Sequence, residues 1–141
     1  MSTQRSGQSP AEQRQMNHSH IFIVNGSPPI LDMMRELFQA ESYNVTTTNF
    51  VPNTFEQIAA LGPDLLMVDV VVGDLAGWDL LERLHDGAMT RGIPVIIFST
   101  SPVLLDRAEH LTTPDSTRRF LTKPFDVPAL LAMVEELIGP A

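Results

Sequence analysis

Cysteine is absent from this 141-residue chain, as are several other features that would restrict its function. Without thiols the chain has no disulfides and no thiolate metal site or nucleophile, which fits a reducing, cytoplasmic location. No apolar run approaches the ~18 residues that a membrane span needs. Lysine occurs once, as Lys123, and the net charge is −8, so the clustered cations of a nucleic-acid surface are missing. We therefore expect neither membrane nor nucleic-acid binding.

The first 18 residues differ in composition from the rest of the chain. They are rich in Gln, Ser and Asn and show no apolar periodicity, which predicts a disordered tail followed by one domain over residues 19–141. They also lack the apolar segment of a secretory signal. Met16 is an alternative start. His18 and His20 form a His-x-His pair without cysteine or acidic neighbours, so we interpret them as solvated residues and not as metal ligands.

Short apolar runs alternate with amphipathic segments through the rest of the chain. The patterns predict strands at residues 21–24, 43–48, 65–68, 95–98 and 119–121. They predict helices at residues 53–61, 78–85 and 103–111. Two more helices should begin at Pro28, with Ser27 as N-cap, and directly after Asp126, which is the N-cap of the last helix. Because the strands are continuously apolar, both of their faces should be covered. Right-handed crossovers between them give an α/β fold with a doubly wound, five-stranded parallel sheet.

Polar residues follow the predicted strands at the points where they end. Asn25 and Gly26 follow the first strand, Asp69 the third, Ser99 the fourth and Lys123 the fifth. Functional crevices of doubly wound sheets lie at the carboxyl ends of the strands. A carboxylate there can attack phosphorus to form an acyl phosphate, and a hydroxyl and an ammonium can hold the transferred oxygens. The pattern therefore favours phosphoryl chemistry, although Asp69 and Ser99 taken singly are equally typical of capping residues.

Three segments carry a resemblance to a known family. PDLLMVDVVVGDLAGWDLLERL (residues 63–84), IPVIIFSTS (93–101) and FLTKPF (120–125) resemble, in order and spacing, the receiver domain of bacterial two-component response regulators, the CheY-like family. The resemblance extends over about residues 20–138. It implies a (βα)5 flavodoxin-like receiver fold with strand order 2-1-3-4-5.

The resemblance also implies roles for single residues. Asp69 corresponds to the phospho-acceptor, Ser99 to the switch hydroxyl, Lys123 to the phosphate-contacting lysine, Phe120 to the switch aromatic and Gly77 to the loop glycine. Such a domain takes its phosphoryl group from a histidine kinase or phosphotransfer protein and is no enzyme beyond accepting it. It contacts a downstream protein through the face made by the fourth helix, fifth strand and fifth helix, and the same face allows a homodimer.

The first strand departs from the family pattern. The family has an acidic pair after this strand, where the chain has Asn25 and Gly26. The remaining ligands for Mg²⁺ are Asp69, the backbone carbonyl of Val71 and the neutral amide oxygen of Asn25. Mg²⁺ prefers oxygen ligands that include carboxylates, so we expect it to bind weakly.

Two alternatives stay open at this point. A phosphorylation-independent pseudo-receiver would keep the fold and the partner face as a protein interaction module, and the missing acidic pair favours it. A hydrolase that forms an aspartyl-phosphate is the other alternative. Such enzymes often place a second Asp two residues after the nucleophile, where this chain has Val71, so this alternative is the weakest.

Overall fold

The computed structural model describes residues 18–71, 75–99, 101, 118–123 and 125–139. Its strands are β1 (His20–Val24), β2 (Asn44–Thr48), β3 (Leu65–Asp69), β4 (Val95–Ser99) and β5 (Arg118–Thr122). They pair in parallel in the order β2-β1-β3-β4-β5. The described helices are α2 (Pro28–Ala40), α3 (Thr54–Leu61), α4 (Ala76–Asp86) and α6 (Val127–Ile138). This architecture confirms the predicted fold class and strand order.

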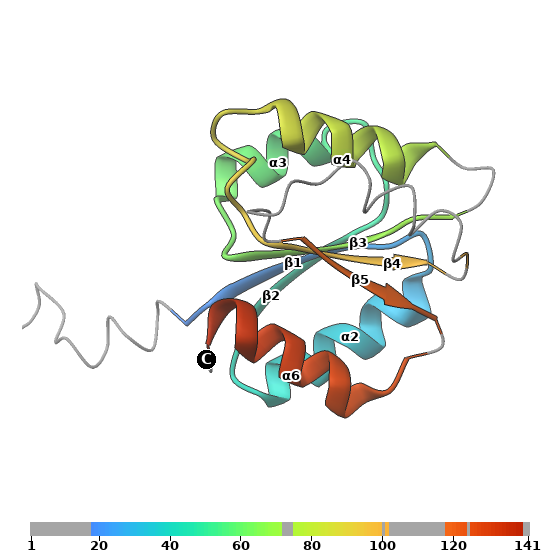
Figure 1. Ribbon diagram of the computed structural model, residues 1–141, viewed down its shortest axis with the longest axis vertical. Coiled ribbons are helices and arrows are strands. Elements are labelled where there is room, and N and C mark those ends of the chain that lie inside the picture. Colours follow the sequence, from blue (N-terminus) through green and yellow to red (C-terminus); the bar gives the residue numbers. More distant parts are fainter. Residues whose placement is uncertain (1–17, 72–74, 100, 102–117, 124, 140–141) are drawn as a thin grey trace, which may run out of the picture.

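Helices cover both faces of the sheet, with α2 and α6 on one side and α3 and α4 on the other (Figure 1). The central strands β1, β3 and β4 are therefore almost fully buried, as their continuous apolar sequences predict. Successive side chains alternate between two core clusters. The cluster beside α2 and α6 includes Ile21, Ile23, Leu65, Met67, Ile96 and Phe98. The cluster beside α3 and α4 includes Phe22, Val24, Leu66, Val68, Val95 and Ile97.

Helix ends agree only partly with the sequence patterns. Asp126 caps α6 as predicted, because its carboxylate accepts a hydrogen bond from the Ala129 N–H at 3.0 Å. Ser27 occupies the N-cap position of α2, but its side chain makes no capping bond. Gly62 ends α3 with φ at +60°, a conformation that glycine adopts without a Cβ penalty.

Some expectations need correction. The third predicted helix begins at Ala76 and not at Trp78, which places Gly77 inside α4. Leu61 and Val127, apolar residues of two predicted helices, are 44% and 40% exposed because they lie at helix ends. The predicted tail, the helix at 103–111 and the loop at 112–117 fall outside the described residues, apart from His18 at the end of the tail. None of the helices described has the length and apolarity to cross a membrane.

Candidate functional site

The predicted site residues lie along one edge of the sheet, at the carboxyl ends of its strands. Asp69 and Ser99 are the last residues of β3 and β4, and Lys123 directly follows β5. The ends of β3 and β4 are offset by one residue, because Asp69 pairs with Phe98 and Ser99 follows Phe98. The Lys123 N–H donates to the Ser99 carbonyl at 2.8 Å, which extends the β4–β5 pairing to the lysine. Parallel strand pairing thus gathers these residues from three separate chain segments.

Asp69 and Lys123 form a direct ion pair. The Lys123 ammonium contacts Oδ1 of Asp69, and the two side chains are 21% and 7% exposed. That oxygen is fully buried and makes no hydrogen bond of good geometry to the described residues. A buried carboxylate is costly unless a charge or hydrogen bonds compensate it. The lysine therefore supplies the compensating charge, and it points into the site and not into solvent.

Ser99 contributes a buried hydroxyl next to this pair. Its Oγ accepts a hydrogen bond from the Ser101 N–H at 3.0 Å, so it shapes the turn that leaves β4. This is the capping role that the sequence left open. Accepting that bond leaves the hydroxyl proton of Ser99 free to be donated elsewhere.

Phe120 lies in the core layer and not in the ion pair. It sits in β5 opposite Ile97 of β4. Its half-buried ring packs against the cluster beside α3 and α4. Phe120 and Lys123 are three residues apart in the chain, so β5 connects the ion pair to this cluster.

Asn25 follows β1 and is buried, but its side chain serves the local turn. Its Oδ1 accepts a hydrogen bond from the Ser27 N–H at 2.8 Å, and its own N–H donates to the Thr48 carbonyl at 3.1 Å. The amide thus shapes the turn into α2. Ser27 makes no side-chain cap, and the prolines at the first two helical positions, Pro28 and Pro29, have no N–H to donate to it. The neighbouring Gly26 is exposed, with open space where a Cβ would stand.

The described donors fit Mg²⁺ poorly. No group of three or more His, Cys, Asp or Glu side chains in the described part of the chain is placed to hold a metal ion. Asp69 is the one carboxylate that the described residues bring to this site, and it is already paired with Lys123. Asn25 is bonded within its turn, and Val71 can offer only a carbonyl. Mg²⁺ usually needs one or two carboxylates not already neutralised.

Gly77 allows α4 to lie close to the end of β3, a role that the sequence did not reveal. A Cβ at this position would stand 2.6 Å from the carbonyl oxygen of Asp69 and 3.5 Å from Cα of Val70. Only glycine allows the first turn of α4 to lie this close to the end of β3. The sequence signal was a glycine eight residues after Asp69, which we interpreted as a loop glycine.

The fold and the strand-end site define a CheY-like α/β signalling domain. The family model described as the response regulator receiver domain matches residues 21–135, and the chain belongs to that family. The response regulator PleD of Caulobacter vibrioides is 29% identical over 119 residues, which are 84% of this chain and 26% of PleD. The chain spans about half or less of the length of the curated relatives it matches.

Solved structures agree on the fold. The chemotaxis protein CheY4 of Vibrio cholerae has a TM-score of 0.70 and 19% identity, covering 85% of this chain and 98% of that one. The receiver domain of a Pseudomonas aeruginosa sensor histidine kinase has a TM-score of 0.66 and 18% identity, covering 86% and 98%, and holds magnesium in its active site cleft. These structures confirm the predicted fold, and the family model confirms the predicted receiver-domain family.

Proposed function

We propose that this receiver domain accepts a phosphoryl group on the carboxylate of Asp69. The observation that carries the proposal is the buried Asp69 at the end of a central strand, ion-paired with the chain's single lysine. Burial and a facing cation are typical of a site built for reaction and not of a surface carboxylate. The donor is a phosphohistidine of a kinase or phosphotransfer protein, and the proposal includes a cytoplasmic location.

The reaction is a single displacement at phosphorus. A carboxylate oxygen of Asp69 bonds to phosphorus while the bond from phosphorus to the donor imidazole breaks. The imidazole nitrogen leaves with the electron pair and takes a proton from solvent. The Lys123 ammonium, already beside Asp69, offsets the charge on the transferred oxygens, and Ser99 donates its free hydroxyl proton to one of them. The domain turns over no other substrate.

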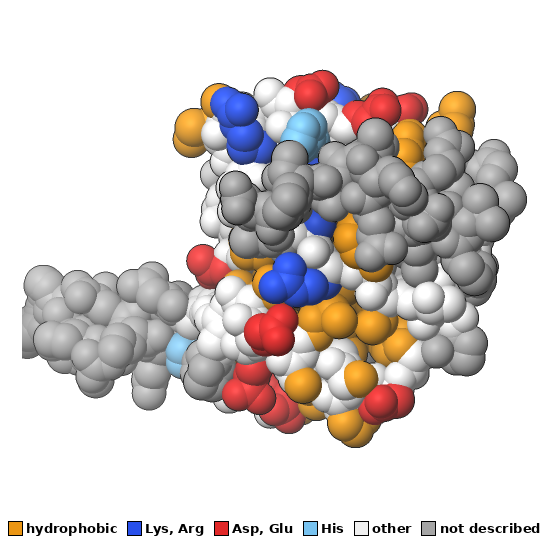
Figure 2. Space-filling model, viewed as in Figure 1, with side chains coloured by type: hydrophobic (Ala, Val, Ile, Leu, Met, Phe, Trp, Pro, Cys, Tyr) orange, Lys and Arg blue, Asp and Glu red, His pale blue; other side chains and the backbone are white. Residues whose placement is uncertain are grey.

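The phosphorylated state is then transmitted through β5. Lys123 and Phe120 lie on the same segment, so a shift of the lysine toward the phosphoryl group moves the strand that carries the aromatic ring. We propose that a downstream protein, or a second copy of the chain, reads this change on the face formed by β5 and α6. Figure 2 shows hydrophobic side chains at the surface here, beside basic ones over β5 and acidic ones over α6.

Phosphoryl incorporation tests the proposal. The full chain is incubated with acetyl phosphate or phosphoramidate, and intact mass spectrometry measures the addition of one phosphoryl group. We expect one addition in the native chain, none in Asp69→Asn, and an unchanged result in Asp86→Asn, which removes an exposed carboxylate of α4. Addition to Asp69→Asn would place the acceptor elsewhere. No addition to the native chain would leave the phosphorylation-independent interaction module, which the replaced acidic pair at Asn25 and Gly26 favours.

Weak Mg²⁺ binding is part of the proposal and has its own test. Gly26→Asp returns a carboxylate to the end of β1, where open space accepts the new side chain. We expect the Mg²⁺ affinity to rise by roughly tenfold or more, equivalent to ~1.4 kcal/mol, because the site gains a second carboxylate. Titration followed by the fluorescence of Trp78 measures it, with Gly26→Asn as the uncharged control. Equal affinity in both variants would mean that the site fails for reasons other than the missing charge.

A further inference from the structure

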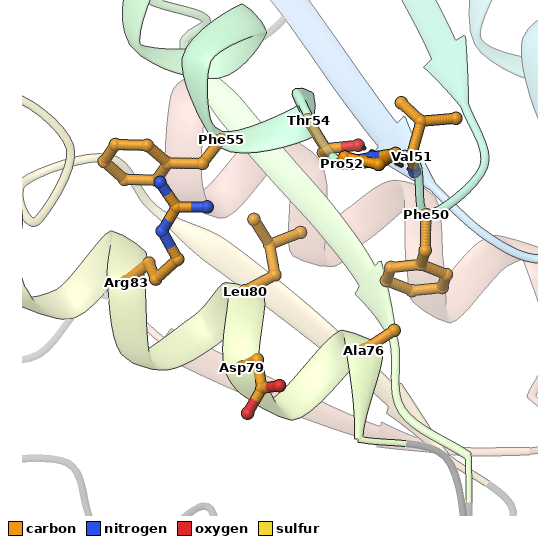
Figure 3. A pocket seen from close by; sticks show the side chains of 9 residues that line it. All are labelled: Phe50, Val51, Pro52, Thr54, Phe55, Ala76, Asp79, Leu80 and Arg83. Carbon is orange, nitrogen blue, oxygen red and sulfur yellow. Dashed lines mark hydrogen bonds between the residues drawn. The ribbon is translucent and has the colours of Figure 1, made fainter.

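A groove separates α3 and α4 on the face of the sheet opposite to α2 and α6. It has a volume of about 240 Å³ and is lined by Phe50, Val51, Pro52, Thr54, Phe55, Ala76, Asp79, Leu80 and Arg83. Figure 3 shows the two phenylalanines at opposite ends, with the Leu80 side chain between them. Leu80 belongs to the core, so the floor of the groove is rigid. None of these residues takes part in the Asp69–Lys123 site.

Arg83, the one cation among the described residues that line the groove, already has two partners. The Arg83 guanidinium lies 4.4 Å from the centroid of the Phe55 ring and binds the Glu56 carboxylate at 2.9 Å. Figure 3 shows this guanidinium stacked over the ring. A backbone hydrogen bond lowers the pKa of Glu56, and the hydrogen bond from Arg83 lowers it further. Arg83 therefore lies at one end of the groove, with its charge balanced in part by the exposed Glu56 carboxylate and its guanidinium over the Phe55 ring.

The free charge of the groove is negative. Asp79 is exposed on α4, and no side chain in the described part of the chain pairs with its carboxylate. Glu82 and Asp86 are exposed on the same helix but do not line the groove. An occupant must therefore combine apolar groups for the floor and the aromatic ends with a cation for Asp79. The volume of the groove also argues against a small molecule or cofactor as the occupant. Pockets for such ligands typically measure ~300–1,000 Å³, and this groove is smaller.

From these observations we infer that the α3–α4 groove is a docking site for a partner protein segment in which a lysine or arginine stands between aliphatic side chains. The aliphatic groups cover Leu80 and Phe50, and the cation lies at Asp79. A groove that accepts one or two anchoring side chains is the usual form of a short recognition site. This inference goes beyond the proposed phosphorylation and does not depend on it.

Capped tripeptides test the inference. The ¹⁵N-labelled full chain is titrated with acetyl-Leu-Arg-Leu-amide, and amide signals are followed by NMR. We expect saturable shifts of Phe50, Phe55 and Leu80, weaker shifts with acetyl-Leu-Glu-Leu-amide, and none with acetyl-Ser-Arg-Ser-amide. Binding of the two leucine peptides with equal affinity would overturn the inference, because the acidic rim would then select nothing.

A matched pair of variants localises the charge. Asp79→Asn should weaken binding of the arginine peptide by up to about fivefold, the range for an exposed ion pair. Glu82→Gln removes the same charge from the same helix outside the groove and should leave the affinity within error. The spectra of both variants report their folding directly. Equal effects of the two substitutions, or shifts that map away from the groove, contradict the inference.

Two further outcomes count against it. No saturable shift up to the solubility of the arginine peptide would mean that the groove holds no such segment. Shifts of the groove signals that depend on protein concentration alone, without peptide, would identify a second copy of the chain as the occupant instead.

Discussion

Gly77 shows at the scale of one residue how packing sets the geometry of the site. Strand β3 ends at Asp69, and α4 begins seven residues later with its first turn against the Asp69 carbonyl. A side chain at position 77 would move either the helix or the strand end. The orientation of the Asp69 carboxylate toward Lys123 therefore depends on a residue that carries no chemistry of its own.

Gly77→Ala should consequently destabilise the fold, although alanine normally favours a helix. The helix preference gains up to ~1 kcal/mol, while forcing a methyl group against backbone costs ~1–3 kcal/mol or more, so we expect a net loss of about 1–2 kcal/mol. Urea unfolding measures the loss, and phosphoryl incorporation should also slow. Gly26→Ala is the control, because its Cβ meets open space at the same sheet edge. Equal stability of both variants would refute the positioning role.

At the scale of elements, the sequence predicted every described strand and helix of the receiver fold, because their signals are local. Apolar runs identified the central strands, the β-branched composition of residues 43–48 identified β2, and Asp126 identified the start of α6. The sequence predicted the site less completely than the fold. Lys123 and Asp69 were expected together, but the sequence could not predict that Asn25 takes over the turn at α2. Such a choice between neighbouring hydrogen-bond partners depends on three-dimensional backbone geometry.

The two N-caps make this difference measurable. Asp126→Ala removes a carboxylate that accepts from the Ala129 N–H, and should lower the free energy of unfolding by about 1 kcal/mol. Ser27→Ala removes a hydroxyl that makes no capping bond and should change stability by less than about 0.5 kcal/mol. Urea or thermal unfolding of both variants gives the comparison. A loss in Ser27→Ala as large as that in Asp126→Ala would contradict the assigned hydrogen bonds.

At the scale of the whole molecule, the parallel sheet brings together groups that are remote in sequence at its other edge too. His20, which we interpreted from the sequence as a solvated residue without acidic neighbours, is instead half-buried at the start of β1. Its N–H donates to the Asp64 carboxylate at 2.7 Å. Its Nε2 lies 2.7 Å from the Thr46 hydroxyl of β2. The Tyr43 hydroxyl donates to the Gly139 carbonyl at 2.9 Å across the same end of the molecule. These contacts join the first strand, the second strand and the end of α6, so they respond to global unfolding.

His20 should make the stability of the whole chain depend on pH. Burial lowers the pKa of His20 below 6.5, and the Asp64 carboxylate opposes this only in part. The unfolded chain therefore binds the proton more readily than the folded one. The stabilisation is present above the unfolded pKa and is lost as the pH falls through 6.5 toward the folded pKa. We expect the urea midpoint to fall between about pH 7.5 and pH 5, and His20→Gln to reduce that slope. His85→Gln, on the exposed face of α4, is the control. If His20→Gln left the slope unchanged, His20 would not be the source of the pH dependence of stability, and groups other than His20 would dominate it.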